Sequence, residues 1–364
     1  MKVQNVIAIL NDLAPLHYAE DFDNTGLLVG SPNAEVTGVL VTLDTLESVV
    51  DEAIEQNCNM IVSFHPIIFS GLKQLTGQNY VARTVQKAIK HDIAIFAIHT
   101  ALDNSFEGVN AKLCSKLGIK NPRILLPKKQ FIQKLTTFVP SNHASKLRKA
   151  LFDAGAGNIG NYSHCSFNIE GTGSFKGESG SNPTVGNQGE LRLEEETQIG
   201  VTFPKHLQSK IVSALFKTHP YEEVAYEITT LENSHQHIGM GMIGELDAPC
   251  TEDHLLQHLK TTLKTGCVRH SAKTGATIKK IAVLGGSGSF AIAAAKAAGA
   301  DAFVSADFKY HDFFQAEGQI LLCDVGHYES EQFTKDLLVD VLTKKITNFA
   351  VVLSQTNTNP ISYF

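Results

Sequence analysis

The chain has 364 residues, of which 43% are hydrophobic and 19% charged, and its formal net charge is -6. That length favours two domains over one core, and the composition is ordinary for a globular protein. Scattered Lys and Arg residues exclude a nucleic-acid-binding stripe, and no apolar run approaches the roughly 18 residues of a membrane span. Six separated cysteines without a CxxC pair, and no secretory leader, predict a cytoplasmic protein with reduced thiols.

Helical and strand patterns alternate over the first part of the chain. Apolar residues at helical spacing predict a helix over 3–16, and a polar turn then leads into a strand. The strands are predicted at 27–30, 38–44, 60–63 and 93–98. This alternation predicts an α/β layer with a mostly buried sheet. His65, His99 and Asp103 follow the ends of two strands, where ligands gather in such folds.

The pattern of predicted helices and strands changes near Lys128. Strands are predicted at 131–139, 197–203 and 225–229, helices at 144–154 and 207–216, and short strands with a mobile loop in the glycine-rich stretch 155–189. The order β-α-β…β-α-β is that of a ferredoxin-like α+β module.

The α/β texture resumes afterwards, with a strand at 280–284, a helix at 291–298 and a strand at 301–305. This order predicts a split α/β domain, residues 1–127 and 236–364, interrupted by an inserted ferredoxin-like domain over 128–235. Histidines and carboxylates that suit a metal site lie on both sides of the insertion.

Imidazole and carboxylate ligands suit Zn, Fe or Mn and often leave a coordination position open for chemistry. His99 and Asp103 are four residues apart, as are His327 and Glu331, so each pair would share one helix face. We therefore expect a divalent-metal site, with a metal-bound water as nucleophile and His99 or His311 as the proton carrier.

Four segments resemble the motif blocks of the Ngg-interacting-factor-like proteins, commonly labelled GTP cyclohydrolase I type 2 homologues. They are Asp23–Leu27, His65–Phe69, His99–Asn104 and His327–Glu331. The stretch His219–Tyr226 is similar to the hallmark of the PII- and CutA-like insert that longer members carry.

The resemblance implies an α/β fold, a dinuclear divalent-metal site and a ring-shaped homohexamer. It also implies that His65 and Asp103 bind one metal, that His327 binds the other, and that Glu331 bridges them. Many members have two adjacent histidines before the proline, and here the first is Phe64. The second site is therefore expected to be weaker, mononuclear in practice, or completed by water or another side chain. His99 is either that substitute or a hydrogen-bond donor to the backbone or to Asp103.

Gly285–Ala291 follows a strand and opens a helix, with Asp307 after the next strand, as in a dinucleotide fingerprint. The segment also resembles the family's own glycine-rich stretch, which implies no nicotinamide cofactor. We expect an anionic substrate group there rather than a dinucleotide.

The leading functional hypothesis is a metal-dependent hydrolase acting on a nucleotide or phosphoester-like small molecule. The alternative is a non-catalytic, ring-shaped metal-binding scaffold. We expect no nucleic-acid or membrane partner in either case.

Overall fold

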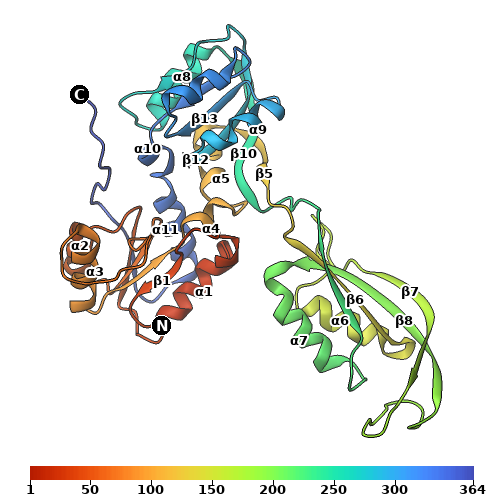
Figure 1. Ribbon diagram of the computed structural model, residues 1–364. Coiled ribbons are helices and arrows are strands. Elements are labelled where there is room, and N and C mark those ends of the chain that lie inside the picture. The colour runs from red at the N-terminus through yellow and green to blue at the C-terminus, as the bar shows by residue number, and fades with distance from the viewer. The chain divides into compact units, whose positions relative to one another are not determined.

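The computed structural model describes residues 1–364, and the chain divides into two compact units. One unit combines Met1–Leu126 with His237–Phe364, and the other spans Pro127–Gln236 (Figure 1). None of the helices combines the length and the apolar character needed to cross a lipid bilayer.

The first sheet of the larger unit has the order β1-β4-β3-β2-β15. Its strands are β1 (Gly26–Val29), β2 (Gly38–Thr42), β3 (Met60–Ser63), β4 (Ala94–Ala97) and β15 (Ala350–Leu353). All pairings are parallel except that of β1 with β4. The continuous apolar runs predicted for a doubly covered sheet are buried throughout β2, β3 and β4.

Helices cover both faces of this sheet. Their bounds are α1 (Val3–Leu13), α2 (Glu47–Glu55), α3 (Tyr80–Lys90) and α11 (Thr334–Lys345). The buried residues of α1 and α11 join Val39, Val41 and Val62 in one core cluster, whereas those of α2 and α3 join Leu40 and Ile61 in another. Alternate strand residues therefore face alternate layers.

The second sheet has the order β11-β14-β13-β12-β10-β5. Its strands are β5 (Lys120–Pro127), β10 (Gly239–Cys250), β11 (Arg269–His270), β12 (Ile278–Ser287), β13 (Ala302–Ala306) and β14 (Leu321–Asp324). β12, β13 and β14 are parallel neighbours. β10 runs antiparallel to β12, and β11 runs antiparallel to β14. The helices associated with this sheet are α5 (Val109–Leu117), α8 (Glu252–Thr262) and α9 (Ile292–Ala297).

Two short helices follow strands and carry three of the four metal candidates, whereas His65 lies just past β3. They are α4 (His99–Asp103), after β4, and α10 (His327–Glu331), after β14. The 3-10 helices are η1 (Leu16–Tyr18), η2 (Ser141–His143), η3 (Lys205–Leu207), η4 (Ser289–Ala291) and η5 (Tyr310–Ala316). Each metal candidate is thus held by backbone just past the carboxyl end of a strand.

The smaller unit confirms the ferredoxin-like order. Its elements are β6 (Ile132–Pro140), α6 (Ala144–Asp153), β7 (Phe167–Lys176), β8 (Leu191–Pro204), α7 (Gln208–Thr218) and β9 (Tyr226–Leu231). The strands form an antiparallel sheet in the order β7-β8-β6-β9, with the buried residues of α6 and α7 in its core cluster. The mixed α/β class with an inserted ferredoxin-like domain is therefore correct.

One part of the insert differs from expectation. The glycine-rich stretch contains a ten-residue strand, β7, that pairs with β8 along its whole length. Residue propensities do not predict this strand, because it contains Gly171 and Gly173 and glycine is depleted in strands. Pairing with β8 supplies the backbone hydrogen bonds that keep the segment extended.

Candidate metal centre

His65 lies just beyond β3, and both of its ring nitrogens face carboxylates. The backbone amide of His65 donates to Leu43 O (2.9 Å), which fixes the residue beside the end of β2. Its Nδ1 lies 2.8 Å from Asp44 Oδ1, and its Nε2 lies 3.2 Å from Glu331 Oε2. The ring is thus oriented from behind by one carboxylate while its other nitrogen points at a second.

His327 repeats this arrangement from the other side. It opens α10, and its Nδ1 lies 2.7 Å from Asp307 Oδ2. Its Nε2 lies 3.1 Å from Glu331 Oε2, the same oxygen that faces His65. One helical turn places Glu331 beneath His327, as the four-residue spacing predicts.

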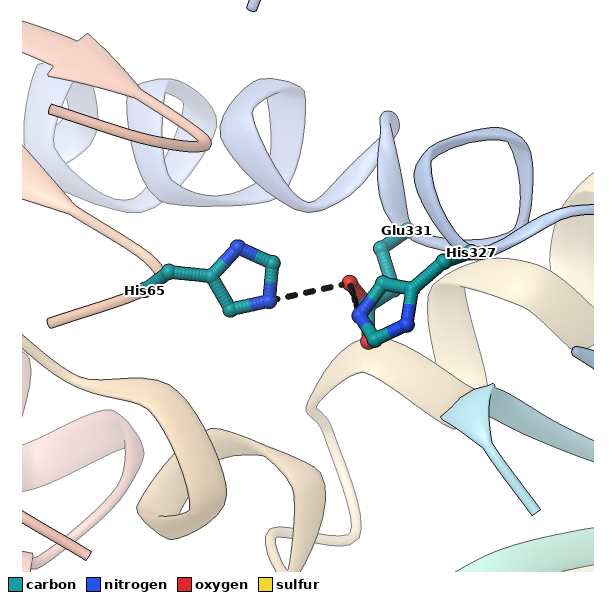
Figure 2. Close-up of side chains that lie close together, drawn as sticks. All are labelled: His65, His327 and Glu331. Carbon is teal, nitrogen blue, oxygen red and sulfur yellow. Dashed lines mark ion pairs between the residues drawn. The ribbon is translucent and has the colours of Figure 1, made fainter. Parts of the chain in front are cut away.

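Figure 2 shows the His65 and His327 rings both close to the Glu331 carboxylate, with dashed lines marking the ion pairs. The ring centroids of His65 and His327 are 5.5 Å apart, and one ligand atom from each of the three residues lies within 4.8 Å of the others. Two imidazole nitrogens and a carboxylate within that distance form a donor set that suits a divalent transition metal.

The buried carboxylate oxygens of this group indicate whether a cation fits between them. Asp103 Oδ1 is buried and has no hydrogen-bond partner, and Glu331 Oε2 is faced only by the two histidine Nε2 atoms, neither of which makes a well-formed hydrogen bond to it. Burying carboxylate oxygens in this state is costly, and coordination to a cation removes that cost. The residues present therefore fit a divalent ion.

Asp103, at the end of α4, belongs electrostatically to the same group. Burial raises the pKa of its carboxyl well above the usual value, and the charge of Glu331 raises it further. Two buried carboxylates whose charges repel each other favour a bound cation or a shared proton. The metal role predicted for Asp103 thus has an electrostatic basis, although Asp103 lies outside the close His65–His327–Glu331 group.

The carboxylates around the two rings raise the pKa of both histidines. Burial lowers the pKa of a histidine, but Glu331 and Asp44 outweigh it and raise the pKa of His65 to about 10. Burial likewise opposes protonation of His327, but the carboxylates of Asp307 and Glu331 raise its pKa to about 11. Burial raises the pKa of Glu331, whereas the two histidines lower it to about 2. The group therefore favours positive charge beside the Glu331 carboxylate, which a divalent ion would also supply.

Sequence reasoning placed Asp307 only as the acidic residue of a dinucleotide fingerprint and did not find Asp44. Asp44 follows β2 and Asp307 follows β13, so both lie at the carboxyl ends of parallel strands beside the strand that precedes the matching histidine. That position was the available signal. Asp307 also has a left-handed backbone, with φ +59°, and strain of this kind in a non-glycine residue is typical of functional sites.

His99 has a different partner from the one expected. Its Nδ1 lies 2.9 Å from Asp23 Oδ1, so its carboxylate is Asp23 rather than Asp103. The His99 ring centroid is 5.1 Å from that of His65, and its backbone φ is +23°. His99 therefore forms a His–Asp pair with Asp23 beside the cluster, and its own backbone is strained. It lies outside the three-residue ligand group.

Asp23 is the anchor of that pair. Thr100 donates to its Oδ2 from the backbone amide (3.1 Å), and the Thr100 hydroxyl lies 2.5 Å from the same oxygen. Burial raises the pKa of Asp23, but the hydrogen bonds from His99 and Thr100 outweigh it and lower the pKa to about 2.

Phe64 and His311 lie elsewhere. Phe64 is fully buried in the core beside α1 and α11, with its ring centroid 4.8 Å from that of His65 and 5.5 Å from that of His99. His311 is exposed on η5, where its ring contacts Tyr310 and Phe314. His311 is thus not part of the close ligand group.

The glycine-rich segment after β12 packs against α10. The Gly285 and Gly286 amides donate to Asn110 Oδ1 (3.0 Å) and Ser330 Oγ (2.9 Å). A Cβ on Gly286, whose φ is +71°, would collide with Glu331 Oε1. The Gly288 amide donates to Ala306 O (3.3 Å), so these three amides are already used. The fingerprint spacing therefore reflects close packing on the ligand helix, and these three amides are not available to an anionic substrate group.

The profile of the Duf34/NIF3 (NGG1p interacting factor 3) family matches residues 1–360. The chain belongs to this family. A Bacillus subtilis protein named GTP cyclohydrolase 1 type 2 homolog is 37% identical over 370 residues, covering 99% of this chain and 98% of that protein. A namesake from Halalkalibacterium halodurans is 38% identical over 365 residues, with 99% and 98% covered.

Solved structures of family members support the fold along the whole chain. A Bacillus cereus protein related to NIF3 is 37% identical, with a TM-score of 0.85 over 100% of this chain and 99% of that one. A Staphylococcus aureus protein is 30% identical, with a TM-score of 0.80 and the same coverage. The Duf34/NIF3 fold therefore includes both units of this chain.

Proposed function

We propose that this Duf34/NIF3 protein binds divalent metal ions through His65, Asp103, His327 and Glu331 and uses them for hydrolysis. One observation carries the proposal. The Nε2 atoms of His65 and His327 lie 3.2 and 3.1 Å from the same buried Glu331 oxygen, and neither makes a well-formed hydrogen bond to it. A divalent ion would supply Lewis acidity and lower the pKa of bound water to about 7.

The side chains around the cluster have distinct roles in this proposal. Asp44 and Asp307 orient the two rings, whose Nε2 atoms would help to hold the ion. Glu331 would hold it together with both histidines, and Asp103 would add a second carboxylate. His99, held by Asp23, carries the proton between the attacking water and the leaving group.

The proposed substrate is a nucleotide or a phosphoester-like small molecule. The relatives named GTP cyclohydrolase 1 type 2 homolog support a nucleotide, because they cover nearly the whole chain. The proposal also includes the homohexamer that the family resemblance implies. A hexamer would elute from size exclusion with light scattering at about six times the 39.5 kDa chain mass.

Metal content and turnover test this function together. Protein purified from metal-replete medium should retain one or two ions of Zn, Fe or Mn per chain, and Glu331→Gln should lose them. A panel of nucleotides and phosphoesters should contain one member whose hydrolysis stops on chelation and resumes on metal addition. Wild-type protein without bound metal would contradict the proposal at its base. Bound metal without any turnover would instead favour the non-catalytic scaffold.

Phe64 bears on the number of ions. The side chain cannot donate to a metal, so we propose one firmly bound ion and a weaker second. Phe64→His should raise the retained metal toward two ions per chain, whereas the control Phe64→Leu should not. Equal metal content in both variants would argue against a vacant ligand position here.

A further inference from the structure

The segment from Ser354 to Asn359 runs between the two halves of the ligand set. It continues β15, which pairs with β2 through Leu353 and Val41. The Ser354 amide donates to Val41 O (2.9 Å), so the segment leaves the sheet beside the carboxyl end of β2, where Asp44 lies. We call residues 354–359 the C-terminal strap.

Glu52 of α2 anchors the start of the strap. It accepts hydrogen bonds from the Ser354 and Thr356 hydroxyls (both 2.6 Å) and from the Gln355 and Thr356 amides (2.7 and 3.3 Å). Four donors on one carboxylate fix the direction of the strap before it reaches the metal cluster.

Thr358 then meets the carboxylate that orients His65. Its hydroxyl donates to Asp44 Oδ2 (2.6 Å), while Asp44 Oδ1 faces His65 Nδ1 at 2.8 Å. Thr358 is only 6% exposed, so water does not readily replace this donor. With both oxygens engaged, Asp44 has one orientation, and His65 Nε2 therefore has one direction.

The next residue reaches the other half of the cluster. Asn359 Nδ2 donates to Glu329 Oε1 (3.1 Å), and Glu329 lies on α10 between His327 and Glu331. Glu329 is 4% exposed, so this contact also lies inside the protein. Two consecutive strap residues thus contact the carboxylate that orients His65 and the helix that carries His327.

We propose that Thr358 is a positioning residue of the metal centre, acting through Asp44 on His65, and that the strap holds both halves of the ligand set in register. This inference rests on the proposed metal function. Loss of a supporting contact of this kind typically weakens metal affinity by about 10–100-fold. Because Thr358 acts through one intermediate residue, we expect removal of its hydroxyl to weaken metal affinity by roughly tenfold, the lower end of that range.

Zn²⁺ affinity by chelator competition and the visible spectrum of bound Co²⁺ test the inference. Thr358→Val keeps the shape and removes the hydroxyl, and should weaken Zn²⁺ binding about tenfold and change the Co²⁺ band intensities. Thr358→Ser keeps the hydroxyl and should restore both. Thr356→Val is the matched control, because Glu52 keeps three other donors, and it should stay within about twofold of wild type.

Each result decides the matter. Wild-type affinity and spectrum in Thr358→Val would overturn the inference, as would equal weakening by Thr356→Val. If Thr358→Val does not fold, Thr358→Ser and Thr358→Ala replace it, since that pair differs only in the hydroxyl. Failure of the wild-type protein itself to bind Zn²⁺ would be a failure of the proposed function, which is separable from an insensitive Thr358.

Discussion

Asp44 and Asp307 play matching parts on the two sides of the cluster, although Thr358 supports only Asp44. Asp307 instead accepts a hydrogen bond from the Ser287 hydroxyl, and its side chain is 45% exposed. The hydrogen bond from His327 lowers the pKa of Asp307, so the carboxylate stays charged near neutral pH. Each metal candidate histidine thus has its own anionic support.

Asp307→Asn should weaken metal binding by about tenfold, because a neutral amide holds His327 less firmly than a carboxylate. The measurement is Zn²⁺ competition at constant pH. Asp340→Asn serves as the control, since Asp340 is 60% exposed and its ion pair with Lys112 lies on the surface. Unchanged affinity in Asp307→Asn would show that His327 does not depend on this support.

Asp23 links the site to acid stability. Its folded pKa of about 2 lies below the unfolded value of about 3.9, so the charged form stabilises the fold by about 2 kcal/mol at neutral pH. This contribution is present above pH ~4 and is lost as pH falls through about 2.

Asp23→Asn should therefore lower the free energy of unfolding by about 2 kcal/mol at pH 7, and its difference from wild type should shrink as pH falls from about 5 toward 2. Urea unfolding at several pH values measures this. The exposed Asp21→Asn should show a small difference at every pH. A pH-independent deficit in Asp23→Asn would mean that lost packing, rather than lost charge, explains the change.

At the scale of elements, the site depends on how closely β12 approaches α10. Gly285 and Gly286 bring the strand end against Ser330 and Glu331, and a side chain on Gly286 would occupy the position of the Glu331 carboxylate. The glycines thus serve backbone packing on the helix that carries two of the metal candidates.

Gly286→Ala should destabilise the protein by roughly 2–5 kcal/mol, from backbone strain plus overpacking, and should abolish metal retention by displacing Glu331. Gly318→Ala is the matched control, because Gly318 has a similar φ of +68° with open space around the added methyl. It should cost only about 1–2 kcal/mol and keep the metal. Urea unfolding and metal content distinguish the two. Equal losses would assign the whole effect to strain.

Sequence patterns predicted some of the strands and missed others. Continuous apolar runs predicted β2, β3 and β4, because burial on both faces leaves little room for polar residues. Hydrophobic periodicity did not reveal β7, since its ladder with β8 rather than its side chains keeps it extended. The carboxylates Asp44 and Asp307 were missed for a related reason. Their partners lie 20–21 residues away and meet them only when parallel strands align.

At the scale of the whole molecule, every metal candidate lies in the unit formed by Met1–Leu126 and His237–Phe364. β5 and β10, which flank the insert in the chain, are neighbours in one sheet of that unit. The chain therefore leaves and re-enters the unit at adjacent strands, as expected where an insertion is tolerated.

Replacing residues 127–236 with a short Gly-Ser linker should leave a folded protein whose Zn²⁺ affinity is within about twofold of wild type, because no ligand residue is removed. Circular dichroism and chelator competition measure folding and affinity. A folded variant that no longer binds Zn²⁺ would show that the insert contributes to the centre. Loss of the oligomer with affinity retained would separate assembly from metal binding.

The contact of Thr358 with Asp44 has a consequence for the order of events during synthesis. At translation rates of about 5–20 residues per second, His65 leaves the ribosome roughly 10–50 seconds before His327, and Thr358 follows later still. A nascent chain therefore carries one half of the ligand set with nothing opposite it, and Asp44 still lacks the Thr358 hydroxyl. Under the proposed function, capture by the whole ligand set waits until Glu331 has emerged, so a stalled chain ending within the insert would hold no ion in this site.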